Sequence, residues 1–274
     1  EREGYTGTPT PAAVAGFVTQ QLHLIADAIA DMSASLLAMR EGCHPFIFYH
    51  RVRPFLSGWK HNPALPSGVV YEGVSQESQQ YFGGSAAQSS LLPMFDIALG
   101  VEHDSPKSRT FLQAMRDYML PPHRAFLQYL EQTANIRPFV LQLVEAAPND
   151  AGDAVDAVLA LKEAYDRAVT GLRRFRSLHM ALVAQYILAQ QAKPTSTTEL
   201  GEPTHPAESP EKRKEERVVS ERMGKGGLEK MAGGKGTGGT DLMKFLRPIR
   251  DDCTARFTIC CNYSAVMMPV AVLL

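Results

Sequence analysis

The sequence has few cysteines and no excess of charge of either sign. Four of its 274 residues are cysteines, and three of these fall within the last 22 residues, so we expect no disulfide framework. Reduced thiols in a cytoplasmic protein are the simpler interpretation. The 28 Lys and Arg residues balance the 29 Asp and Glu residues, whereas a dedicated nucleic-acid binder carries a basic surface. No nucleic-acid partner is therefore expected.

Long apolar runs are also scarce. No apolar stretch follows a basic segment at the start of the sequence, so no signal peptide is predicted. The tail from Phe257 to Leu274 is at the short limit for a membrane span and contains several polar residues and Pro269. A tail anchor is the less favoured interpretation, and a poorly packed or non-native tail is the favoured one. We expect no other stretch to span a bilayer, and no membrane partner.

The sequence has no run of alternating polar and apolar residues long enough to predict a sheet. Apolar residues instead recur at steps of three and four, the pattern of amphipathic helices. The second expected helix is interrupted at Pro54, and the third opens with a capping box from Ser85 to Gln88 and ends at Gly100. The expected helices cover residues 18–39, 45–59, 85–99, 107–119, 122–132, 137–146, 153–192 and a short stretch after Thr240. The predicted fold class is all-α.

One internal segment is too polar to build a core. No Phe, Tyr or Trp occurs from Ile187 to Lys244, and 14 of the 30 residues in 206–235 are charged. Such a segment buries too little apolar surface to offset the entropy of ordering it. We predict a disordered loop over about 194–235.

His179 is the residue with the most informative position. It lies on the apolar stripe of the predicted helix 153–192, where each ring nitrogen of a neutral imidazole needs a partner. Spacing alone favours a core histidine bonded to neighbouring groups. The alternative is an axial haem ligand, because one imidazole on a rigid helix is all that a five-coordinate iron requires from protein. Arg176, one turn earlier, either reaches a haem propionate or is a solvated edge residue.

Arg53 lies among the aromatic residues Phe46, Phe48, Tyr49 and Phe55. A guanidinium in this setting can bind a carboxylate through two hydrogen bonds while the rings hold an apolar ligand. A boundary arginine that stacks on a ring explains the pattern at least as well.

Two glycine-rich runs also stand out. Residues 83–88 let the backbone approach a bound planar group, although a tight turn into a capped helix explains them equally well. Residues 236–240 lack the Gly-Lys-Ser/Thr of a phosphate-binding loop, so a mobile glycine hinge fits them better. No spacing of His, Cys, Asp and Glu predicts a zinc site.

Short motifs in a fixed order carry more information than any single residue. They are Phe55-Leu56-Ser57-Gly58-Trp59-Lys60, Tyr71-Glu72-Gly73-Val74-Ser75-Gln76-Glu77, Gly83-Gly84-Ser85-Ala86-Ala87-Gln88-Ser89, Met115-Arg116-Asp117-Tyr118-Met119 with Pro121-Pro122-His123, Leu172 to His179, and Gly236-Thr237-Gly238-Gly239-Thr240. Over about residues 22–250 they resemble, in order, the indoleamine 2,3-dioxygenase family. Residues 74–77 and Ala86-Ala87 look closer to its second vertebrate paralogue than to its first.

The resemblance implies the helical domain of a haem enzyme that opens the indole ring of L-tryptophan with O₂, giving N-formylkynurenine. It implies haem b as the cofactor, a place in the kynurenine pathway of tryptophan catabolism and a link to immune regulation. His179 matches the proximal iron ligand, and Arg176 with Asp96 matches an ion pair near a propionate. The family needs no protein side chain as general acid or base.

The resemblance also implies the residues that contact the substrate. Arg53 matches the arginine that holds the substrate carboxylate, and Phe48 and Tyr49 match its aromatic neighbours. Gly84, Ser85 and Ala86 match the loop that lines the distal pocket, where Gly84 is expected to lie against the haem. Thr237 matches a substrate-contacting threonine on a mobile loop, so residues 194–240 are expected to close over the substrate.

We expect three regions: an atypical segment over 1–20, the helical haem domain over 21–250, and an atypical apolar tail over 251–274. The smaller N-terminal domain of the family is expected to be absent, and the chain is expected to be a monomer. The alternative function is a catalytically weak or inactive haem-binding or signalling relative, and a third is an O₂-carrying haem protein.

Overall fold

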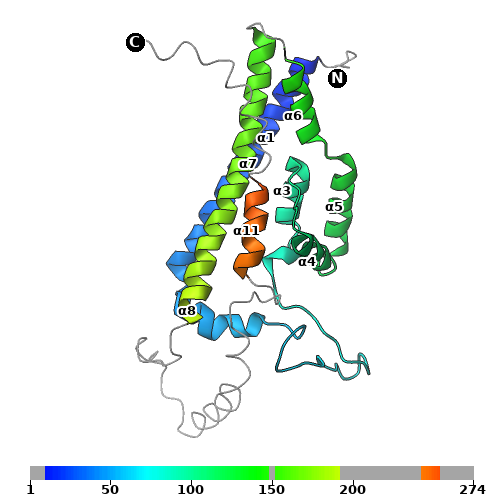
Figure 1. Cartoon of the computed structure of the whole chain (residues 1–274), viewed down its shortest axis with the longest axis vertical. Coiled ribbons are helices and arrows are strands. Elements are labelled where there is room, and N and C mark those ends of the chain that lie inside the picture. Colours follow the sequence, from blue (N-terminus) through cyan, green and yellow to red (C-terminus); the bar gives the residue numbers. More distant parts are fainter. Residues whose placement is uncertain (1–9, 148–151, 192–241, 254–274) are drawn as a thin grey trace, which may run out of the picture. The chain divides into compact units, whose positions relative to one another are not determined.

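The computed structural model describes residues 10–147, 152–191 and 242–253, which form helices joined by loops (Figure 1). These residues contain no β-strand, only an isolated antiparallel bridge between Val69 and Gln79. The prediction of an all-α fold is confirmed.

The chain divides into two compact units. Unit 1 comprises residues 1–38, 87–179 and 246–274, and unit 2 comprises residues 39–86 and 180–245. The main helices are α1 (Pro11–Gly42), α3 (Leu91–Leu99), α4 (Pro106–Arg116), α5 (Pro121–Thr133), α6 (Ile136–Glu145), α7 (Asp153–Val183) and α11 (Leu242–Asp252). Along the chain, α1, α7 and α11 each continue from one unit into the other.

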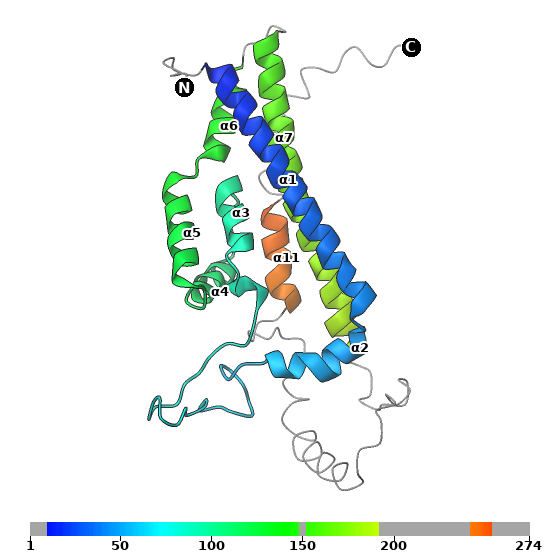
Figure 2. The same cartoon turned by 180° about the vertical axis from the view of Figure 1, so that it is seen from behind.

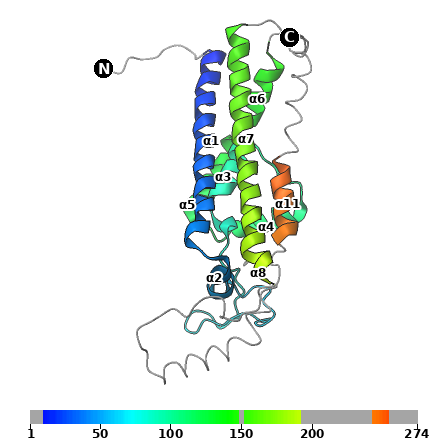
Figure 3. The same ribbon diagram turned by 90° about the vertical axis from the view of Figure 1, so that its left-hand side faces the viewer.

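The core of unit 1 forms where α1 lies beside α7 (Figure 3). Buried residues on both helices recur at steps of three and four, as the sequence predicts. A Cβ atom built on Gly171 of α7 would lie only 3.5 Å from Cγ2 of Ile29, so the two helices approach closely here. On the same core, α3 packs against α5 and α6 (Figure 2). The buried members are Ala15, Leu22, Ala26, Ile29, Phe95, Leu99, Val140, Leu161, Ala164, Ala168, Val169, Leu172 and Cys253.

Several helix ends follow the sequence signals. Gly100 ends α3 in the left-handed conformation with φ of 66°, as expected of a C-terminal glycine. The predicted capping box at Ser85 is wrong, because α3 begins only at Leu91 and residues Ala86–Gln88 form the short 3₁₀ turn η3. Pro93 explains the difference: it lies in the first turn of α3, where proline is tolerated, whereas in a helix that began at Ser85 it would lie in the interior and cost a hydrogen bond.

Unit 2 is built from short helical pieces. The predicted helix 45–59 consists of α2 (Pro45–Ile47), a π-helical turn η1 (Phe48–Val52) and a 3₁₀ turn η2 (Arg53–Leu56). Pro54 lies in the first turn of η2, where its missing amide hydrogen and its ring are tolerated. The interruption at Pro54 is therefore confirmed, and the segment ends three residues earlier than expected. The predicted helix 153–192 likewise changes after α7 into a π-helical turn η4 (Ala184–Leu188) and α8 (Ala189–Gln191).

The expectation that no stretch other than the tail is able to span a bilayer is wrong for helix α1. By length and composition it is the one helix in the described ranges that is long and apolar enough to cross a bilayer. The sequence interpretation considered only the tail from Phe257, which lies outside the described residues together with the 194–235 loop, Thr237 and Thr240. Part of the apolar content of α1 is explained by Leu22, Ala26 and Ile29, which lie in the core of unit 1.

Candidate functional site

A buried ion pair joins α3 and α7 in unit 1. Nη2 of Arg176 lies 2.7 Å from both carboxylate oxygens of Asp96, and the two residues are only 6% and 7% exposed. Burial on its own would lower the pKa of Arg176, but the charge and hydrogen bonds of Asp96, together with the contact to Cys253, outweigh it and raise the pKa. Charges this deep are tolerated only in such pairs. The structure thus pairs the two residues, and their role beside a propionate stays a prediction.

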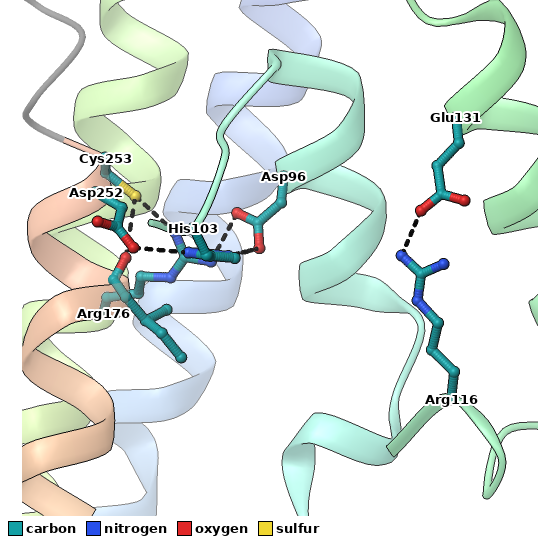
Figure 4. Close-up of polar contacts among 8 residues, drawn as sticks. Asp96, His103, Arg116, Glu131, Arg176, Asp252 and Cys253 are labelled. Atoms are coloured by element: carbon teal, nitrogen blue, oxygen red, sulfur yellow. Dashed lines mark hydrogen bonds and ion pairs between the residues drawn. The ribbon is translucent and has the colours of Figure 1, made fainter. Parts of the chain in front are cut away.

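His103 and α11 extend this pair (Figure 4). Nε2 of His103 lies 3.1 Å from Asp96 Oδ2, and its Nδ1 lies 3.1 Å from Asp252 Oδ2 at the end of α11. Next to Asp252, Cys253 Sγ accepts a hydrogen bond from Nη1 of Arg176. Side chains from α3, α7, α11 and the loop after α3 therefore meet in one buried polar network.

His179 lies one turn after Arg176 on α7 and is half-buried. Burial lowers the pKa of His179, so its imidazole is neutral near neutral pH. Within the described part of the chain, neither ring nitrogen makes a hydrogen bond. A neutral imidazole on a rigid helix, with a lone pair that none of the described residues uses, is the donor that an axial iron site requires.

In unit 2, η1 and η2 place Arg53 close to aromatic side chains of η1, here called the aromatic wall (Phe48 and Tyr49). Arg53 is 4% exposed, and its guanidinium carbon lies 5.5 Å from the centre of the Tyr49 ring. Burial lowers the pKa of Arg53, with the Tyr49 hydroxyl opposing it, although an arginine stays charged at any ordinary pH. Phe48 meets the edge of the Tyr186 ring at 5.8 Å. Phe55, which the sequence grouped with this wall, is instead 86% exposed.

The loop from residue 57 to residue 84 closes at its base by backbone contacts. The amide groups of Trp59 and Lys60 both donate to the carbonyl of Tyr81, at 2.8 and 2.9 Å. The amide of Gly84 donates to the carbonyl of Leu56, at 3.1 Å. A Cβ atom on Gly58 would lie 2.2 Å from the nitrogen of Gly83, so only glycine fits there. This closure places Gly84, Ser85 and Ala86 directly beside the end of η2, three residues after Arg53.

The predicted site residues thus fall into two groups. Unit 1 contains the predicted iron-side residues, which are His179, Arg176 and Asp96. Unit 2 contains the predicted substrate-side residues, together with Gly84; they are Phe48, Tyr49, Arg53, Ser85 and Ala86. Thr237 lies outside the described residues.

Three residues of the polar network were missed from the sequence. His103 belongs to none of the motifs in the sequence, and Asp252 and Cys253 fall within the segment 251–274 that the sequence predicts to be an atypical tail. No local signal finds them, because Asp96 and Asp252 are brought to His103 only by folding. In unit 2, His50 was also missed: its ring lies 4.4 Å from that of Phe46 and 4.8 Å from that of Tyr49. Among the described residues, no group of three or more His, Cys, Asp or Glu side chains has the arrangement of a metal site.

Comparison with known proteins identifies the family. The sequence model of the indoleamine 2,3-dioxygenase family matches residues 11–256. The chain is 37% identical to indoleamine 2,3-dioxygenase 2 of Homo sapiens over 232 residues, which cover 85% of this chain and 48% of the relative. It is 35% identical to indoleamine 2,3-dioxygenase 1 of Mus musculus over 233 residues, covering 84% and 48%.

A fungal relative gives the same result. Indoleamine 2,3-dioxygenase of Saccharomyces cerevisiae is 35% identical over 251 residues, covering 87% of this chain and 50% of the relative. The chain therefore spans about half the length of the relatives it matches. Because the family match covers most of its residues, the chain belongs to the indoleamine 2,3-dioxygenase family.

Proposed function

We propose that this chain is the haem-binding helical part of a dioxygenase that opens the indole ring of L-tryptophan with O₂ to give N-formylkynurenine. The observation that carries the proposal is His179, a neutral, half-buried imidazole whose ring nitrogens make no hydrogen bond to the described residues. A core histidine would be expected to bond to neighbouring groups. An iron ligand needs that nitrogen lone pair for the metal.

His179 would hold haem b through its iron, which supplies the activation of O₂ when the cofactor is bound. Arg176 lies one turn before His179 on α7, and Asp96 on α3 is paired with Arg176. Because Asp96 bonds Nη2 and Cys253 bonds Nη1, the guanidinium has a fixed orientation. A buried cation of fixed orientation, one turn from the proposed iron ligand, suits a haem propionate carboxylate.

The residues of unit 2 would bind the substrate. Arg53 is a buried, permanent cation and would hold the carboxylate of L-tryptophan. Phe48 and Tyr49 would pack against the indole ring, and the Gly84–Ala86 backbone, which has little side-chain bulk, would let a planar group approach closely. These contacts orient the substrate and exclude water, which is the protein's contribution to such a reaction.

Absorbance of N-formylkynurenine tests this proposal. The full chain is reconstituted with haem, reduced, and supplied with O₂ and L-tryptophan. We expect product formation with the wild-type chain and none with His179→Ala, while the exposed His23→Ala variant serves as a matched control. Product at an equal rate from His179→Ala would contradict the proposal. Haem uptake through His179 without product would instead favour a haem-binding or signalling relative, and reversible O₂ binding without product an O₂ carrier.

The location and oligomeric state of the protein also belong to the proposal. We infer a cytoplasmic monomer, supported by the few cysteines and the balanced charge. Size-exclusion chromatography with light scattering tests the oligomeric state, and a dimer mass at micromolar concentration would contradict it.

A further inference from the structure

The polar network of unit 1 forms a closed ring of contacts (Figure 4). It runs from Arg176 on α7 to Asp96 on α3, then to His103, and on to Asp252 at the end of α11. Cys253, the neighbour of Asp252, closes the ring by accepting from Arg176. The family resemblance accounts for only the Arg176–Asp96 pair, so His103 and its bond to α11 require their own explanation.

The geometry of His103 defines its protonation state. Each of its ring nitrogens lies 3.1 Å from a carboxylate oxygen, one on Asp96 and the other on Asp252. A neutral imidazole carries a single N–H and can donate to only one of them. Its other nitrogen would then present a lone pair to a carboxylate. Both contacts are hydrogen bonds only when His103 is an imidazolium.

The charges around His103 favour that state. Asp96 faces it from α3, Arg176 from α7, and Asp252 from the end of α11. Burial on its own would lower the pKa of His103, and Arg176 acts in the same direction. The hydrogen bonds and charge of Asp96, with the hydrogen bond of Asp252, outweigh both and raise the pKa above its ordinary value of 6.5.

Cys253 does not compete for this positive charge. Burial raises the pKa of the Cys253 thiol, so it stays protonated and neutral. Two cations, Arg176 and the His103 imidazolium, then balance two carboxylates, and loss of the His103 proton would leave one negative charge in excess. Buried uncompensated charge is strongly unfavourable.

Helix α11 depends on contacts of this kind. It has 11 residues, and Pro248 within it has no amide hydrogen for an internal hydrogen bond. Helices of this length are marginal in isolation, so α11 is stabilised by the residues it packs against. Two buried residues hold it by apolar contacts: Ile249 within α11 and Cys253 directly after its end. The Asp252–His103 bond is the ionic anchor at the same end.

We propose that His103 is a positioning residue that, as an imidazolium, clamps α11 to α3 and so fixes the Arg176 guanidinium one turn before His179. The clamp is a property of unit 1 and stands without any cofactor. Its consequence for the iron side rests on the proposed function.

The clamp weakens as pH rises. When α11 is detached, His103 loses the hydrogen bond of Asp252, which is one of the contacts that raise its pKa, so in the clamp it holds its proton to higher pH. A group whose pKa is raised contributes fully below the lower value and loses its contribution as pH passes the higher one. Between the two values, detachment of α11 is expected to increase about tenfold per pH unit.

Hydrogen exchange of the α11 amides, in the full chain without haem from about pH 6 to about pH 9, tests the clamp. After correction for intrinsic exchange, we expect protection of residues 246–252 to fall with rising pH, while that of α5 stays constant. His103→Gln should lower α11 protection at pH 6, because glutamine is neutral and cannot balance the charge of the two carboxylates as the imidazolium does.

Asp252→Asn is the sharper variant, because it repairs the clamp at high pH. A neutral His103 can donate to Asp96 and accept from the side-chain amide introduced at position 252, so protection of α11 should no longer depend on pH. Asp251→Asn is the matched control: Asp251 is paired with Arg250 on the exposed side and does not contact His103, so this variant should keep the wild-type pH dependence. Protection that is independent of pH in the wild-type chain, or equally pH-dependent in Asp252→Asn, would overturn the proposal.

A second readout addresses the iron side. In the haem-loaded chain, the Soret maximum should shift with pH over the same range in the wild type and in Asp251→Asn, and stay constant in Asp252→Asn. A shift of equal size in Asp252→Asn would overturn the positioning role. Failure to bind haem, with the exchange result intact, would contradict the proposed function and leave the clamp supported.

Discussion

The two units hold their functional residues by different means. In unit 1, charged side chains from helices far apart in the sequence meet in a buried network with Asp96 at its centre. In unit 2, the relevant residues lie between positions 48 and 86, and backbone hydrogen bonds with one close glycine contact keep them together. Unit 1 should therefore be sensitive to changes of charge, and unit 2 to changes of backbone volume.

The largest effect is expected from Asp96→Ala. This variant leaves Arg176 and His103 buried without their shared carboxylate, which should lower the free energy of unfolding by about 3–5 kcal/mol. Urea denaturation measures it. The control is Asp27→Ala, which breaks the exposed Asp27–Arg167 pair and should cost less than about 1 kcal/mol. Equal losses in the two variants would contradict the difference between buried and exposed pairs.

Gly58→Ala should have the second largest effect and should act on unit 2. Its Cβ would meet the backbone of residues 81–83, so the base of the loop must open, at a cost of about 3 kcal/mol. Thermal unfolding measures the loss. Gly42→Ala is the control, because open space surrounds that position, and it should not destabilise the chain. A Gly58→Ala chain as stable as the wild type would show that the loop base is not a fixed contact.

Arg53→Leu separates binding from stability. If Arg53 holds the substrate carboxylate, its loss should raise KM for L-tryptophan by roughly tenfold or more, the worth of a charged hydrogen bond. Steady-state kinetics measures this. Tryptamine, which has the indole ring but no carboxylate, is the matched control substrate and should be affected little. Equal losses for both substrates would assign Arg53 to packing rather than to carboxylate binding.

The smallest effect is expected from Tyr186→Phe. The Tyr186 hydroxyl donates to the carbonyl of Cys43 at 2.7 Å, and the ring meets Phe48. Removal of the hydroxyl keeps the ring contact and should lower the free energy of unfolding by about 1 kcal/mol. Tyr129→Phe, at an exposed position, should change it by much less. A null result for Tyr186 would mean that its ring alone holds this part of unit 2.

The same contrast explains how much the sequence could predict. The steps of three and four along α1 and α7 are local, so the helices, their buried stripes and the break at Pro54 could be predicted. The start of α3 was wrong because a favourable cap at Ser85 was given more weight than Pro93. The pairing of Arg176 with Asp96 came from family resemblance, since 80 positions separate them.

The role of His103 could not be found in this way. Its chemistry depends on the simultaneous presence of Asp96 and Asp252, and the separation of 149 positions between His103 and Asp252 carries no sequence pattern. The wall of unit 2 was partly found, because Phe48, Tyr49 and Arg53 are neighbours in sequence. Phe55 was misplaced, since the turn at Pro54 directs it to solvent.

The absorption spectrum of the full chain titrated with haem tests the central claim, that His179 holds an iron cofactor. We predict a saturable Soret band with the wild-type chain, retained in His23→Ala and lost in His179→Ala, whose circular dichroism should show an unchanged helical fold. A Soret band of the same position and affinity in His179→Ala, or no saturable band in the wild-type chain, would contradict the claim.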